Sequence, residues 1–118
     1  MTAGGSRGPD MHAFVESLVG QTIQTLSGKP NEVLRVDGDR VLVGTRRSPA
    51  GAWVRISEIQ DAADRLWMDG ELDLSKHSVG YRSAFVAAVL ERLPETIATL
   101  GPRWIRLART GRETKHRG

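Results

Sequence analysis

The sequence predicts a small α+β protein with an N-terminal helix, a three-stranded β-meander and two further helices. Its 118 residues suit a single domain with a modest core. Apolar residues recur with helical spacing in three segments, and two β-rich runs around a glycine turn separate the first two segments. We expect this domain at residues 10–108, after a disordered lead-in at 1–9 and before a basic disordered tail at 109–118.

The first helix is predicted from Met11 to Leu26. Asp10 is a favoured N-cap residue, and Gly28 and Pro30 are typical of a helix end. The apolar residues expected on its buried stripe are Val15, Leu18, Val19, Ile23 and Leu26.

A β-meander should follow this helix. Runs 32–36 and 40–45 flank Asp37-Gly38-Asp39, where glycine supplies the positive φ of a tight hairpin loop. After a connection at 46–51, residues 52–56 alternate well enough to form a third strand with Trp53 and Arg55 on one side.

The second helix should begin at a capping box formed by Ser57 and Gln60 and end at Gly70. Its outer face would hold the acidic residues Glu58, Asp61, Asp64 and Asp69. Because carboxylates repel a phosphate backbone, we expect this helix to be a support.

A third helix is predicted after a short extended piece at 72–74, with Ser78 as its cap and Pro94 at its end. Its expected buried side contains Tyr81, Phe85, Val86, Val89, Leu90 and Leu93. The apolar segment 97–107, which includes Trp104, should form a short element that packs back on the domain.

Enzyme and metal signatures are scarce. The chain has no cysteine, no phosphate-binding glycine motif and three widely separated histidines, His12, His77 and His116. The carboxylates of 58–73 could imitate the metal cluster of a nuclease, but their helical spacing also explains them as a solvated face. We therefore expect no enzyme activity, no cofactor and no metal. The chain lacks an apolar run long enough for a membrane, which favours a cytoplasmic, nucleoid-associated protein.

Charge is segregated along the chain. Residues 29–56 carry a net charge of +3, residues 57–74 carry −5, and the two segments that follow, 75–94 and 95–118, carry +2 and +4. This pattern suits a molecule with one face for phosphate, although a solvated surface with a basic tail would show it too.

Two basic segments are candidate DNA-binding sites. Arg46, Arg47 and Ser48 lie in a loop between strands, where guanidinium groups could bind phosphate as a wing does, or the loop could be an ordinary exposed turn. At the start of the third helix, hydroxyl groups and cations accompany free backbone N–H groups, as in a recognition helix. The candidates in this second segment are Lys76, Ser78, Tyr81, Arg82 and Ser83, although a tyrosine at helical spacing from Phe85 is more often part of the core.

Three motifs carry a resemblance to a known family: TLSGKPN at 25–31, TRRSPAG at 45–51 and GYRSAFVAAVLERLP at 80–94. With them, residues 20–94 resemble a winged-helix-like module of bacterial McrA-type, modification-dependent HNH restriction endonucleases. The resemblance implies a DNA reader, because such a module would deliver a nuclease to DNA that sometimes carries a modified base. The HNH residues are absent here, and the clear hairpin precedes the recognition helix, whereas a wing usually follows it.

The leading hypothesis is therefore a non-enzymatic domain that binds double-stranded DNA, with the third helix at the major groove and the Arg46–Arg47 loop on adjacent backbone. An extension of this hypothesis is that the domain reads methylated DNA in restriction or defence. It would do so alone, with a partner nuclease or as a homodimer. The alternative is an accessory protein-interaction subunit of a larger assembly, with Trp104 as its anchor.

Overall fold

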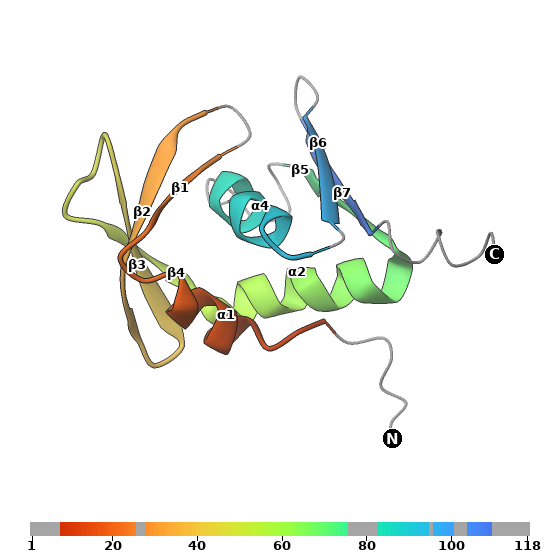
Figure 1. Ribbon diagram of the computed structural model, residues 1–118, viewed down its shortest axis with the longest axis horizontal. Helices are drawn as coiled ribbons and strands as arrows, with labels where there is room; N and C mark the ends of the chain where they lie inside the picture. Colours follow the sequence, from red (N-terminus) through yellow and green to blue (C-terminus); the bar gives the residue numbers. More distant parts are fainter. Residues whose placement is uncertain (1–7, 26–27, 76–82, 95, 101–103, 110–118) are drawn as a thin grey trace.

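The computed structural model describes residues 8–25, 28–75, 83–94, 96–100 and 104–109. Two antiparallel sheets stand at opposite ends of this part of the chain, with helices between them (Figure 1). The described helices are α1 (Met11–Ser17), α2 (Ile56–Asp69) and α4 (Ser83–Glu91). The α+β class is confirmed.

The N-terminal sheet has four strands in the order β1-β2-β3-β4, not the three expected. They are β1 (Thr22–Gln24), β2 (Pro30–Asp37), β3 (Arg40–Thr45) and β4 (Ala52–Arg55). The predicted hairpin is confirmed, since Asp37 pairs with Arg40 around Gly38, whose φ is +61°. The third predicted strand is confirmed as β4.

The C-terminal sheet, in the order β5-β7-β6, was not predicted as a sheet. Its strands are β5 (Glu71–Ser75), β6 (Thr96–Leu100) and β7 (Trp104–Arg109). β6 and β7 form a hairpin that follows α4, and β5 joins this hairpin through β7. The apolar segment 97–107 is therefore two strands, and Arg109, expected in the tail, is still part of β7.

The first helix is much shorter than predicted. Asp10 caps it as expected, because its Oδ1 accepts hydrogen bonds from the N–H groups of His12 (3.0 Å) and Ala13 (3.2 Å). The helix ends at Ser17, and after a turn through Gly20 (φ +90°) the chain enters β1. This segment pairs with β2 as a strand and does not continue the helix, and Ile23 is buried in the strand. As a consequence, Val19, which was expected on the buried stripe of the helix, is 41% exposed.

The predicted capping box of α2 is wrong. The helix begins one residue earlier, at Ile56, whose N–H donates to the Asp39 carbonyl (2.7 Å), and the N-cap residue Arg55 makes no side-chain capping bond. Gln60 instead binds the N-terminal segment: its Oε1 accepts from Met11 N (2.8 Å) and its Nε2 donates to the Pro9 carbonyl (2.8 Å). The expected end at Gly70 is confirmed, with a left-handed C-cap.

Gly8 and Pro9, which we expected in the lead-in, pack on α2. Gly8 N donates to Asp64 Oδ1 (2.9 Å), and a Cβ at Gly8 would lie 2.9 Å from Ala63. Asp64 is thus half-buried and hydrogen-bonded, not part of a fully solvated face.

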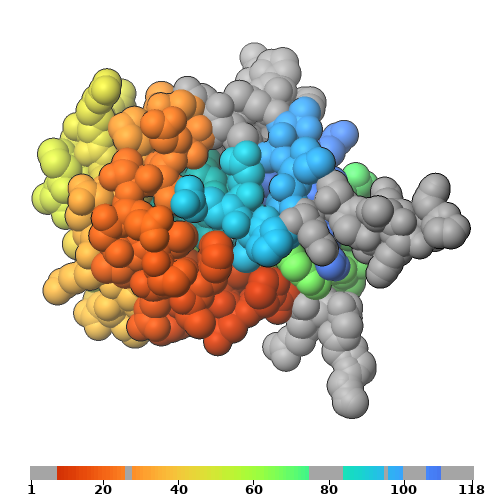
Figure 2. Space-filling model, in the orientation of Figure 1, coloured from red at the N-terminus to blue at the C-terminus, as the bar shows by residue number. Residues whose placement is uncertain are grey.

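α4 is the centre of the molecule, between the two sheets and over α2 (Figure 1). Every residue from Phe85 to Leu90 is buried, as is Leu93, so the predicted apolar side of this helix is confirmed for its described residues. In the space-filling view, atoms of α4 lie between those of the two sheets (Figure 2). None of the described helices is long and apolar enough to cross a membrane.

Candidate functional site

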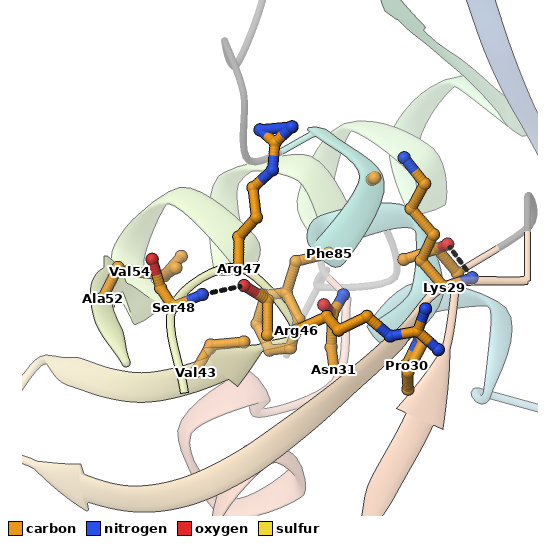
Figure 3. A pocket seen from close by; sticks show the side chains of 13 residues that line it. Lys29, Pro30, Asn31, Val43, Arg46, Arg47, Ser48, Ala52, Val54 and Phe85 are labelled. Carbon is orange, nitrogen blue, oxygen red and sulfur yellow. Dashed lines mark hydrogen bonds between the residues drawn. The ribbon is translucent and has the colours of Figure 1, made fainter. Parts of the chain in front are cut away.

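A groove of about 930 Å³ opens between one end of the N-terminal sheet and the first turn of α4 (Figure 3). Thr25, Lys29 and the loop at 45–48 contribute its rim. Strands β2, β3 and β4 contribute residues below them, and Ala84 and Phe85 of α4 form the opposite side. The groove therefore lies between the loop of Arg46 and Arg47, which the sequence singled out, and Ala84 and Phe85 of α4, which directly follow the second candidate segment.

The interior of the groove is apolar. Val43 and Val54 belong to the face of the N-terminal sheet that points into the core, and both are at most 5% exposed. Phe85 meets them from α4 and is also 5% exposed. Such a floor excludes water and favours a flat or apolar ligand surface.

Three cations surround this floor. Lys29, Arg46 and Arg47 are exposed, and none of them has an ion pair or a ring contact with the described residues. No described residue that lines the groove is acidic. A ligand with negative charge would therefore meet uncompensated positive charge at the rim.

The loop that carries Arg46 and Arg47 is held by its own hydrogen bonds. Ser48 N donates to Thr45 Oγ1 (3.1 Å), and the Ser48 carbonyl accepts from Thr45 N (3.0 Å) and Gly51 N (2.9 Å). The turn ends at Gly51, which has a φ of +99°. Because the backbone is fixed at both ends of the turn, the two arginines are presented from a defined platform, which projects from one end of the molecule (Figure 2).

Asn31 is the polar exception inside the groove. It lies on the inward face of β2, opposite Thr45 of β3, and is only 7% exposed. Its side-chain amide points among the lining residues (Figure 3) and makes no hydrogen bond to any described residue. Its amide atoms are not among the fully buried polar atoms that lack a partner, so they reach the groove, where a ligand could pair with them.

The structure places the sequence-predicted site residues in two groups. Arg46, Arg47 and Ser48 line the groove, and Ser83 begins α4 beside it. Lys76, Ser78, Tyr81 and Arg82 lie outside the described residues.

Sequence reasoning missed Lys29 and Asn31. The sequence pattern predicts Gly28 and Pro30 at the end of a long helix, whereas Gly28, at φ +87°, precedes β2 and Pro30 is the first residue of that strand. The Gly-Lys-Pro tripeptide in front of a β-rich run was the available signal.

The predicted contacts of the third helix with a DNA major groove lie at its start, mostly at residues outside the described ones, and stay a prediction. The body of α4 offers no free face, because its side chains from Phe85 to Leu90 are buried against the sheets and α2. Of this helix, only the first turn reaches the candidate groove, through Ala84 and Phe85.

Within the described residues, no three histidine or acidic side chains come together in a way that could hold a metal ion. The acidic residues of α2 have different surroundings: Asp61 is exposed, whereas Asp64 bonds with Gly8 and Gln60. The chain was also compared with models of protein families, with curated proteins and with solved structures, and none of them matches it.

Proposed function

We propose that this protein is a non-enzymatic, cytoplasmic domain that binds double-stranded DNA, and that the groove between the 45–48 loop and the start of α4 is its contact surface. The observation that carries the proposal is the set of three exposed cations, Lys29, Arg46 and Arg47, around a rim without described carboxylates. Phosphate contacts from such side chains provide most of the affinity of DNA-binding domains.

The winged-helix-like architecture is part of the proposal. It is supported by the order of elements in the second half of the chain, where helix α2, strand β5, helix α4 and the hairpin β6–β7 follow one another. In this interpretation β6–β7 would be the wing, so the wing would follow the recognition helix as it usually does. The N-terminal sheet packs on α4, which is why contact would shift from the helix body to its first turn.

The resemblance to McrA-type endonuclease modules adds a role to this binding. In that role the domain would read methylated DNA and bring a partner nuclease, or a second copy of itself, to it. Arg82, which the sequence singled out, would also bind phosphate.

The proposal is tested by fluorescence anisotropy with labelled duplexes at two salt concentrations. The duplexes are unmodified, 5-methylcytosine-containing and N6-methyladenine-containing. We expect affinity that falls with salt, because each phosphate contact releases counterions. Preference for one modified duplex would support the reading of methylation, whereas no binding to any duplex at low salt would refute the proposal.

Variants assign the contact surface. The double variant Arg46→Ala/Arg82→Ala should weaken binding by about tenfold or more, and Arg46→Ala/Arg47→Ala should act similarly. A matched control, Arg65→Ala/Arg92→Ala, also removes two exposed arginines but leaves the groove unchanged. Equal losses in the control and the groove variants would show that net charge alone drives the binding.

The second candidate function is a protein-interaction subunit, and one observation favours it. Ile97 is 55% exposed on β6, which is an edge strand of the C-terminal sheet. An apolar side chain on an edge strand suits pairing with a strand of another protein. A monomer by size-exclusion mass measurement with salt-sensitive DNA binding would favour the first function, and a dimer indifferent to DNA would favour the second.

A further inference from the structure

The groove differs from a surface that only holds a phosphate backbone, because it has a buried interior. Val43, Val54 and Phe85 form an apolar floor below the three cations, and a backbone contact would not use it. Its volume of about 930 Å³ also exceeds what a phosphate group needs and falls in the range of pockets that enclose small organic ligands.

Asn31 makes this interior selective. Its amide carries two N–H donors and a carbonyl acceptor, so it can pair with a neighbouring donor and acceptor on one edge of a nucleobase. The residue is only 7% exposed, and its amide makes no hydrogen bond to the described residues. The amide atoms are not among the fully buried polar atoms without a partner, so they open onto the groove. With no bond to the described residues, both groups of the amide are available to a ligand.

From the cationic rim, the apolar floor and the unpaired amide together, we infer that the groove takes one unstacked nucleobase of the bound DNA. Asn31 hydrogen-bonds the edge of this base, Phe85 and the valines cover its faces, and Lys29, Arg46 and Arg47 hold the phosphates on either side. This inference rests on the proposed function and names the part of the DNA that the groove receives.

The free energy needed to unstack one base decides which DNA binds best. Taking a paired base out of a duplex loses stacking and pairing, whereas a base in a single-nucleotide bulge has no pairing partner to lose. The domain should therefore prefer DNA in which one base is already free.

The experiment compares three duplexes of the same sequence by anisotropy: one fully paired, one with a single-nucleotide bulge that carries 2-aminopurine, and one with an abasic residue in the bulge. The abasic bulge keeps the bend but offers no base. We expect the 2-aminopurine bulge to bind about tenfold more tightly than either of the other duplexes, and its fluorescence to change on binding as the base moves to new neighbours.

Two variants separate this inference from the proposed function. Asn31→Leu has nearly the same size but no hydrogen-bonding group, so it should abolish the preference for the 2-aminopurine bulge. Affinity for the paired duplex should stay unchanged. The melting temperature of the protein should stay unchanged or rise. Arg46→Ala/Arg47→Ala should instead weaken binding to all three duplexes by a similar factor.

Equal affinity for the two bulged duplexes, or a preference that survives in Asn31→Leu, would overturn the inference while DNA binding itself stands. Binding to none of the three would overturn the proposed function as well.

Discussion

The solvent face and the groove end of the N-terminal sheet use arginine differently. On the solvent face, the ring of Trp53 contacts both Arg35 and Arg40, whose guanidinium carbons are 5.5 and 4.3 Å from its centre. Arg40 also lies 3.8 Å from a carboxylate oxygen of Asp37. At the groove end of the same sheet, Arg46 and Arg47 have no such partners among the described residues.

This difference shows that the number of basic residues in a segment does not identify a binding surface. Residues 29–56 contain five arginines, and at least two of them are already engaged with an aromatic ring or a carboxylate. A guanidinium that stacks on tryptophan has part of its surface covered, so it gains less from a phosphate than a free one does.

The largest expected effect comes from removing three cations at the groove, compared with removing three from the solvent face of the sheet. Lys29→Ala/Arg46→Ala/Arg47→Ala should lower duplex affinity by about a hundredfold at low salt and reduce the salt slope by about three, since each cation neutralises one phosphate. Arg35→Ala/Arg40→Ala/Arg55→Ala removes the same charge from the other face and should change affinity only a few-fold by the same argument. Anisotropy titrations over a range of salt concentrations measure both. Similar losses of affinity in the two triple variants would mean that the groove and the solvent face contribute equally to DNA binding.

The next effect concerns the turn that presents the arginines. Gly51→Ala should destabilise the protein by about 2 kcal/mol, because its φ is +99° and a Cβ would lie 2.8 Å from Leu42 Cδ1. Gly20→Ala is the matched control, since Gly20 has a φ of +90° but nothing within 4 Å of its Cβ position. It should cost only about 1 kcal/mol. Urea unfolding measures both, and equal costs would argue against close packing at Gly51.

A smaller effect is expected on the solvent face. Trp53→Ala should lower the free energy of unfolding by about 1–2 kcal/mol through loss of its half-buried ring and its cation–π contacts. DNA affinity should stay within error of the unchanged protein. A clear loss of affinity in the folded variant would move the candidate surface to this face.

The smallest effect concerns the hydrogen bond that begins the turn. Thr45→Val keeps the shape of the side chain but removes the acceptor of Ser48 N, which should cost about 1 kcal/mol. Thr22→Val on β1, an exposed position whose hydroxyl makes no hydrogen bond to the described residues, is the control and should be close to neutral. Urea unfolding distinguishes the two, and an unchanged stability in Thr45→Val would show that the turn does not depend on this bond.

Local chemistry explains which elements were predictable. Asp10 before a helical apolar pattern, Gly38 between two β-rich runs and Gly70 after a helix each act within a few residues, and all three have the expected role. Ser57 and Gln60 also fitted a local pattern, yet the amide of Gln60 binds the backbone of Pro9 and Met11, which are distant in sequence. Competition of this kind cannot be seen from spacing.

The candidate groove was predictable only in part. Arg46, Arg47 and Ser48 stood out as a basic loop, and the start of the third helix stood out beside them. Asn31 carried no signal, because an asparagine at the edge of a β-rich run is usually a turn residue. Its burial depends on the register of β2 against β1 and β3.

The α+β class, the first hairpin, the C-terminal end of α2 and the apolar character of α4 follow from the amino-acid sequence, because propensity, periodicity and turn chemistry act over short stretches. Long-range contacts are what make residues 22–24 a strand, pair β7 with both β5 and β6, and bury α4 from Phe85 to Leu90. Strand pairing and burial depend on contacts between distant segments, whose free energy outweighs the local preference of a few residues.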